Sequence, residues 1–169
     1  MPIGEALLPE LDQEAAATRK VLERVPEDKL GWKPHEKSMT MGRLATHLTE
    51  LPGWVKLAID QDEIDIAPSG EPAFTPQVVE SVSAMVELFD RNVAETRALI
   101  GSTPDDTFMK PWTMKKAGEE VFTAPKIGVI RHDIMNHLIH HRGQLTVYLR
   151  LSGVSVPSTY GPTADEPAL

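Results

Sequence analysis

Three histidines of this sequence, His47, His137 and His141, lie at positions where an amphipathic helix presents apolar side chains. His137 and His141 are four residues apart, so their rings lie on neighbouring turns of one helix face, with about 6 Å between the Cβ atoms. Burying a polar ring without a partner costs roughly a few kcal/mol. Because a divalent cation shared by all three rings removes much of that cost, the pattern favours a metal site.

The apolar spacing of two segments places these histidines on core-facing stripes. In the segment 126–152, the stripe consists of Ile127, Ile130, Ile134, His137, His141, Gln144, Tyr148 and Leu151. In the segment 40–59, the same spacing gives Leu44, His47, Leu51, Trp54 and Ala58. The sequence therefore predicts that imidazoles from two separate helices point into one core.

Three neutral imidazoles leave coordination positions of a divalent cation open, which is typical of catalytic rather than structural sites. Zinc, nickel, iron, cobalt and manganese all accept imidazole ligands, and the residues do not select among them. A cation bound in this way lowers the pKa of a coordinated water or thiol. The expected chemistry is therefore activation of a small nucleophile.

Other side chains could satisfy or support these rings. The simpler alternative to a metal is a set of core histidines that bond to the backbone or to Glu50 and Asp133. With a metal present, either carboxylate could instead accept the second ring proton of a ligand. Arg142 could bind a substrate carboxylate, although a surface salt bridge is the simpler expectation. The remaining histidines are expected at the surface, with His140 as a possible neighbour of the site: His35, His132 and His140.

Composition narrows the classes of function. The chain has 169 residues, a size that fits one domain spanning 1–169. Its formal net charge of −8 does not favour nucleic acid or an anionic membrane as a partner. We expect a cytoplasmic protein, because the acidic first residues do not resemble a secretory signal and no apolar run is long enough to span a membrane. Without cysteine, any thiol in the reaction must arrive with a substrate.

The predicted fold is all-α. Helices are expected over 4–25, from Ser38 or Thr40 to 59, over 75–101 and over 125–152. Pro52 should kink the second helix, and Thr75 and Pro76 should begin the third. The long polar connection 61–74 could cross the bundle, so that helices two and three run parallel. The segment 112–123 predicts a small β-hairpin before the last helix, and the tail after Gly153 has too many turn-forming residues for regular structure.

At these residues the sequence resembles the DinB-like (DinB/YfiT-type) metalloprotein superfamily. The matching stretches are MTMGRLATHLTELPGW, NHLIHHRGQLTVYLRLSGVSVPSTYGPTADE and WKPHEKS. The family carries one histidine on the second helix and an HxxxH pair on the last, and these positions correspond to His47, His137 and His141. The resemblance covers most of the chain in the right order.

The resemblance implies a four-helix bundle with a long crossover between helices two and three, commonly a homodimer. It also implies one divalent metal ion, nickel or zinc before iron or manganese, bound by the three histidines. Some relatives are thiol-dependent transferases or isomerases that use a low-molecular-weight thiol. The leading hypothesis is therefore a metal-dependent, thiol-dependent transferase that acts on a small-molecule substrate.

Two other functions remain open at this point. The first is hydrolysis at the metal, with Glu50 as the proton acceptor. The second is a stress-related metal-binding or interaction protein without turnover. The tryptophans Trp32, Trp54 and Trp112 could form the wall of a pocket or belong to the core.

Overall fold

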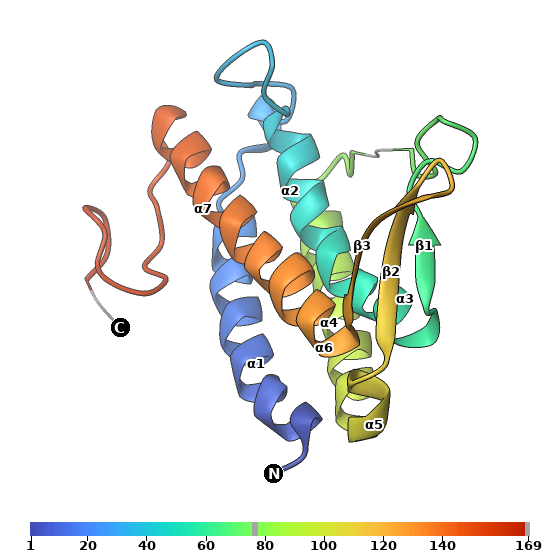
Figure 1. The fold of residues 1–169 in the computed structure, drawn as a ribbon. Helices are drawn as coiled ribbons and strands as arrows, with labels where there is room; N and C mark the ends of the chain where they lie inside the picture. Colours follow the sequence, from blue (N-terminus) through green and yellow to red (C-terminus); the bar gives the residue numbers. More distant parts are fainter. Residues whose placement is uncertain (76–77, 168–169) are drawn as a thin grey trace.

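A computed structural model describes residues 1–75 and 78–167 of the chain, which is mostly helical with one small sheet (Figure 1). The longer helices are α1 (Ile3–Leu22), α2 (Met41–Glu50), α3 (Trp54–Asp60), α4 (Val82–Ser102) and α7 (Asn136–Leu151). The short helical segments are η1 (Glu27–Lys29), η2 (Leu51–Gly53), α5 (Asp105–Phe108), α6 (Lys126–Gly128) and η3 (Val129–Met135). The strands are β1 (Glu63–Asp65), β2 (Pro111–Lys116) and β3 (Glu119–Pro125).

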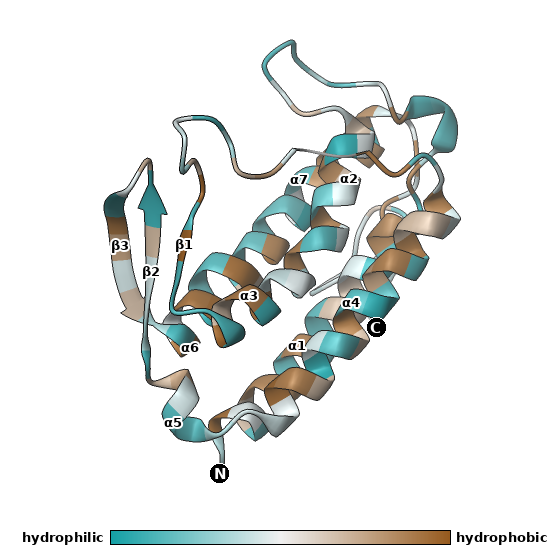
Figure 2. Ribbon diagram, turned by 90° about the vertical axis from the view of Figure 1, so that its right-hand side faces the viewer, coloured by the Kyte–Doolittle hydropathy of each residue, from teal (hydrophilic) through white to brown (hydrophobic). Residues whose placement is uncertain are grey.

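The long helices pack against one another around an apolar core. Helix α1 contacts α4 and α7, and α2 contacts the same two helices (Figure 1). The ribbons of α1 and α4 alternate between hydrophobic and hydrophilic residues, as expected for helices with one buried face (Figure 2). The largest fully buried core residues of this region are Leu22, Met41, Leu44, Leu48, Leu51, Met85, Phe89 and Leu145.

The sheet has the order β1-β2-β3, with β1 parallel to β2 and β2 antiparallel to β3. The predicted hairpin is present and turns at Ala117 and Gly118, both with positive φ. The Asp65 carboxylate accepts hydrogen bonds from both of these backbone N–H groups. Strand β1 was not predicted, so the all-α expectation is corrected to a mostly helical chain with a three-stranded sheet.

The helix boundaries differ from the sequence prediction where local geometry changes. Thr40 caps α2, as predicted, by accepting a hydrogen bond from the Arg43 N–H at 3.2 Å. The kink expected at Pro52 takes the form of the 3-10 turn η2. Helix α4 begins at Val82 rather than near Thr75, because Ser81 caps it. Pro76, which was expected to start that helix, lies outside the described residues.

Lys126 ties the last helical region to the end of α3. Its side chain is only 2% exposed, and its Nζ donates to the backbone oxygens of Ile59 at 2.8 Å and Gln61 at 2.7 Å. The same Nζ lies 2.9 Å from a carboxylate oxygen of Asp62. The buried ammonium group is therefore fully paired, and it fixes the start of β1 relative to α6.

Arg142 is also buried, at 2% exposed, so both of its sequence-based roles are wrong. Its guanidinium lies 2.7 Å from the Glu14 carboxylate and donates to the Glu14 backbone oxygen at 3.1 Å. The Tyr160 hydroxyl donates to the same carboxylate at 2.7 Å, and the Arg142 guanidinium lies 4.9 Å from the centre of the Tyr160 ring. This cluster joins α7, α1 and the C-terminal tail.

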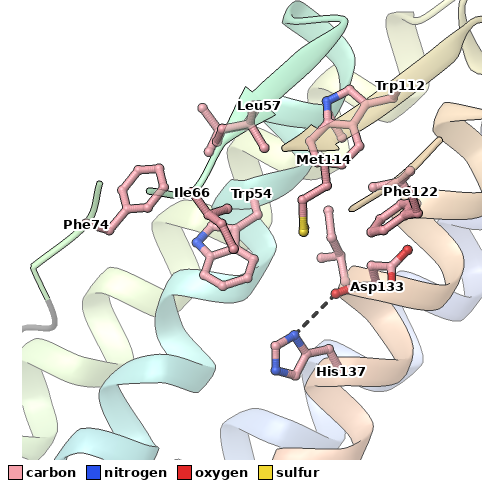
Figure 3. Close-up of a pocket in the computed structure, with 13 residues that line it drawn as sticks. Trp54, Leu57, Ile66, Phe74, Trp112, Met114, Phe122, Asp133 and His137 are labelled. Carbon is pink, nitrogen blue, oxygen red and sulfur yellow. Dashed lines mark hydrogen bonds between the residues drawn. The ribbon is translucent and has the colours of Figure 1, made fainter. Parts of the chain in front are cut away.

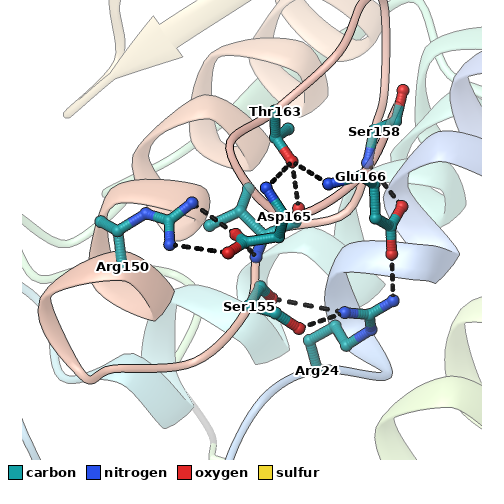
Figure 4. Close-up of polar contacts among 8 residues, drawn as sticks. Arg24, Arg150, Ser155, Ser158, Thr163, Asp165 and Glu166 are labelled. Atoms are coloured by element: carbon teal, nitrogen blue, oxygen red, sulfur yellow. Dashed lines mark hydrogen bonds and ion pairs between the residues drawn. The ribbon is translucent and has the colours of Figure 1, made fainter. Parts of the chain in front are cut away.

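The tail after Gly153 has no helix or strand among its described residues, in agreement with the prediction. It is nevertheless held by ion pairs, of Asp165 with Arg150 and of Glu166 with Arg24 (Figure 4). The Arg150 hydrogen bond lowers the pKa of Asp165, and the Ser158 backbone N–H lowers the pKa of Glu166. Side-chain pairing therefore orders a segment whose turn-forming residues exclude regular structure.

None of the helices formed by residues 1–75 and 78–167 is long and apolar enough to span a lipid bilayer.

We predict that Lys126→Met destabilises the protein by about 2 to 4 kcal/mol, because two buried carbonyl oxygens lose their donor. Urea unfolding measures this change in the free energy of unfolding. The exposed Lys116→Met is the matched control and should leave stability within about 0.5 kcal/mol of the wild type. Equal stability of the two variants would contradict the role assigned to Lys126.

Candidate metal centre

The structure brings the three predicted histidines together. His47 comes from α2, and His137 and His141 come from adjacent turns of α7, which packs against α2. The Nε2 atom of His137 lies 3.3 Å from that of His47 and 2.8 Å from that of His141. One ring nitrogen from each residue lies within 4.8 Å of the other two. His47 and His141 are each 9% exposed, so the cluster is mostly shielded from water.

The hydrogen bonds of the outer ring nitrogens set the protonation of two rings. His137 Nδ1 lies 3.3 Å from the backbone oxygen of Asp133, which can only accept, so this Nδ1 carries the proton. His141 Nδ1 lies 2.7 Å from Oε1 of Gln144 and donates in the same way. The neutral rings therefore direct their Nε2 lone pairs toward each other, an arrangement that is repulsive unless a cation lies between them.

The distances between the rings suit a common metal ion. Two imidazole nitrogens bound to zinc at about 2.0 to 2.1 Å lie roughly 2.8 to 3.4 Å apart for angles between octahedral and tetrahedral. The Nε2 atom of His137 is separated from those of His141 and His47 by 2.8 and 3.3 Å, and both distances fall within this range. The donor set therefore fits a divalent metal ion in its chemistry, and the separations of His137 from His47 and from His141 match a shared ion.

Burial keeps the three rings neutral. Burial is the main cause, and together with smaller contributions from His141, His137 and Arg43 it lowers the pKa of His47 to about 4. Burial is also the main cause of the lowered pKa values of His137 and His141. Since a metal ligand must be deprotonated, these rings are available for coordination at neutral pH.

The groups around the rings differ in part from those expected. Glu50 lies near His47, with Oε2 3.5 Å from Nδ1, but the same carboxylate oxygen is 2.8 Å from the Arg43 guanidinium. Asp133 contacts His137 through its backbone oxygen, whereas its carboxylate lies 3.2 Å from His132 Nδ1. Sequence reasoning assigned no role to Gln144. Its position on the His141 stripe, three residues along, was the available signal.

The other histidines remain at the surface, as expected. The side chain of His132 is 81% exposed, and His35 and His140 are also exposed. The ring of His140 lies 5.0 Å from that of His141, centre to centre, so it borders the cluster without joining it.

The last predicted helix is interrupted immediately before His137. Residues Val129–Met135 form a π-helix, and α7 then begins at Asn136. A π-helical turn is rare and occurs frequently at functional sites, because it shifts the residues that follow around the helix axis. Here it precedes the first histidine of the pair, and its Asp133 supplies the carbonyl that orients His137.

An apolar cavity of about 350 Å³ begins at His137 and extends between α3, the sheet and η3 (Figure 3). Its aromatic wall is formed by Trp54, Phe74, Trp112 and Phe122. The Trp54 ring packs edge-on against His47 and His137, with centre distances of 5.4 and 5.9 Å. Trp32 packs on Tyr148 instead, so two of the three tryptophans line the cavity.

Comparison with known proteins identifies the family of the chain. A model of the DinB family matches residues 3–168. The chain belongs to the DinB family. It is 27% identical over 154 residues to the uncharacterized protein YrdA of Bacillus subtilis strain 168, covering 90% of this chain and 85% of the relative.

Two solved structures share the fold of this DinB family member. One is a DinB-like protein from Bacillus cereus ATCC 10987, with a TM-score of 0.69 and 24% identity, covering 92% of this chain and 97% of that chain. The other is the DinB-like protein YjoA of Bacillus subtilis, with a TM-score of 0.66 and 18% identity, covering 91% and 97% of the two chains. At these identities the similarity establishes the fold alone.

We predict that the metal-free protein loses stability as the pH falls from about 6.5 to about 4. In this window the unfolded chain binds protons at histidine while the folded cluster does not, so protons favour unfolding. His47 alone accounts for about 3 kcal/mol, since one pKa unit is worth about 1.4 kcal/mol. Urea unfolding of chelator-treated protein at several pH values measures the loss. The assignment of low pKa values to the folded histidines would be contradicted if the wild type lost no stability in this pH window. It would also be contradicted if His47→Asn lost as much stability as the wild type.

Proposed function

We propose that His47, His137 and His141 bind one divalent metal ion, nickel or zinc, and that the protein is a metal-dependent enzyme of the thiol-dependent transferase type. The observation that carries the proposal is the 2.8 Å separation of the Nε2 atoms of His137 and His141, together with the apolar cavity that His137 lines. DinB family membership supports this ligand set. It also supports a four-helix bundle with a long crossover and a homodimeric state, and the proposal includes both.

The residues around the ligands have separate roles in this proposal. The Asp133 carbonyl and Gln144 hold the Nδ1 protons of His137 and His141, which fixes the tautomers needed for coordination through Nε2. On the other side, Glu50 lies between Arg43 and His47. Because its carboxylate is already engaged by Arg43, an orienting role for Glu50 fits better than that of a free proton acceptor.

The bound metal would supply a positive charge that lowers the pKa of a coordinated thiol. Since the chain has no cysteine, the thiol is a low-molecular-weight substrate. The cavity beside His137 offers space for a second, electrophilic substrate and surrounds it mostly with apolar side chains. This adjacent cavity is the reason to favour an enzyme over a metal-binding protein without turnover, for which a closed site is expected.

We predict that His141→Ala lowers zinc affinity at least about a hundredfold, because it removes one of three ligands. Gln144→Leu should lower it by about 10- to 100-fold through loss of the ring orientation. Competition with a chromophoric chelator measures both. His140→Ala, at an exposed neighbouring position, is the matched control and should bind zinc as the wild type does. Undiminished affinity of His141→Ala would show that the ligand assignment is wrong.

We predict metal-dependent thiol consumption with an aromatic electrophile. With glutathione or cysteamine and 1-chloro-2,4-dinitrobenzene, a carbon–sulfur bond forms, the carbon–chlorine bond breaks, chloride leaves and the thiol proton passes to solvent. Absorbance of the thioether product measures the rate for the zinc-loaded and nickel-loaded protein. Chelation and His141→Ala should each abolish the enzymatic rate.

The same assay separates the alternatives. Metal-dependent hydrolysis of a panel of esters and amides without added thiol would favour the hydrolase, with Glu50 as the residue to replace next. Full metal occupancy without turnover of any electrophile in a broader panel would favour the non-catalytic metal-binding protein.

A further inference from the structure

The cavity beside His137 is apolar on nearly every side. One residue from each strand forms a continuous row, in which Ile64 of β1 pairs with Met114 of β2, and Met114 pairs with Phe122 of β3. All three side chains line the cavity. On the opposite side, Trp54 and Leu57 of α3 complete the wall (Figure 3). The small sheet is therefore one wall of a binding cavity.

The cavity has one acidic side chain in its lining and no basic one. Among the described residues that line it, Asp133 is the only carboxylate, and there is no lysine or arginine. The Asp133 carboxylate has a side-chain contact with His132 Nδ1 at 3.2 Å, and His132 is at the surface. The Asp133 side chain is 36% exposed, so an anionic ligand in the cavity would lie near a partly solvated carboxylate and would find no countercharge in the lining.

Aromatic side chains give the cavity the shape of a ring-binding site. Trp112 and Phe122 lie next to each other, with ring centres 6.1 Å apart, and Trp54 and Phe74 face them across the cavity (Figure 3). The volume of about 350 Å³ is near the lower end of the range for ligand pockets, so the ligand is small. Flat rings bury a large apolar surface against such walls and gain specific ring–ring contacts.

We propose that this cavity binds the electrophilic substrate as an uncharged compound with a flat apolar ring system, and that Asp133 selects against anions. The assignment rests on the proposed function only in calling the ligand a substrate. Binding itself depends on the sheet, α3 and η3, none of which carries a proposed metal ligand. Asp133 is a specificity-determining residue in this proposal, since its charge acts on the ligand and its backbone oxygen orients His137.

Two probes of equal shape test the charge selection. The neutral probe is 2-acetylnaphthalene, and the anionic probe is 2-naphthoate. Isothermal titration calorimetry on zinc-loaded and on chelator-treated protein gives the two affinities. In the metal-free protein no cation offsets the charge of Asp133. The neutral probe should therefore bind at least about tenfold more tightly than the anionic probe. The neutral probe should also bind the zinc-loaded protein.

Replacing the charge isolates the role of Asp133. Asp133→Asn keeps the shape and the backbone oxygen that bonds to His137, so the fold and the site geometry are retained. We predict that this variant narrows the ratio of neutral to anionic affinity by about three- to tenfold and leaves the neutral affinity within about twofold. An unchanged ratio would overturn the selection by Asp133.

Replacing one cavity residue tests the location. Met114→Trp fills the cavity from β2 and should abolish binding of the neutral probe. Thr113→Trp is the matched control. Thr113 directly precedes Met114 in β2, and its side chain contacts Thr123 on the face of the sheet opposite to the cavity. It should bind the probe normally. Circular dichroism and zinc affinity confirm that both variants are folded.

The outcomes separate this proposal from the proposed function. Three results would each overturn the cavity assignment. The wild type could fail to bind the neutral probe, the metal-free protein could bind both probes with equal affinity, or Met114→Trp could bind the neutral probe normally. Loss of metal binding or thiol transfer with intact probe selectivity would instead overturn the proposed function and leave the cavity assignment standing.

Discussion

The structure depends on holding three neutral imidazoles within a few ångströms of one another at the boundary of a hydrophobic core. Close approach of nitrogen lone pairs is unfavourable, and so is the removal of the rings from water. The chain meets these costs by fixing α2 against α7 with apolar residues such as Leu44, Leu48 and Leu145. The outer ring protons of His137 and His141 are given acceptors. A shared cation would turn the remaining repulsion into attraction, and the proposed function follows from this balance.

The ring cluster and the cavity use different parts of the fold. The long helices supply the histidines, whereas α3, the π-helical segment and the small sheet supply most of the cavity wall. Lys126 holds these parts together, because it bonds to the end of α3 from the start of the last helical region. The histidines and most of the cavity wall therefore lie on different elements, and His137 belongs to both.

The sequence was sufficient for the features that depend on periodicity and on local stop signals. The helical spacing placed His47 and the His137 and His141 pair on core-facing stripes, and the structure brings them together. Thr40 was a correct cap, and the hairpin before the last helix is present. Family membership is confirmed by the match over residues 3–168. Residue spacing predicts these features because each of them depends on residues within one helix or one hairpin.

The features that the sequence did not reveal depend on contacts between distant segments. Strand β1 is three residues long and exists because β2 lies beside it, so the connection 61–74 gave no strand signal. The π-helical segment preserves an apolar helical pattern, and periodicity alone does not distinguish it from an α-helix. Arg142 was expected at the surface because its partner, Glu14, is 128 residues away. Ion pairs of this kind have no local signature.

The contact between Tyr160 and Glu14 links the irregular tail to the buried ion pair between α1 and α7. Tyr160 bonds to the carboxylate that holds Arg142, and Arg142 adjoins His141 in α7. Cutting the chain after Gly153 would remove the Tyr160 contacts and expose the buried ion pair of Glu14 and Arg142 to water. The described tail residues 154–167 thus partly cover a buried ion pair, and a protein that lacks them would differ in its interior as well as in its length.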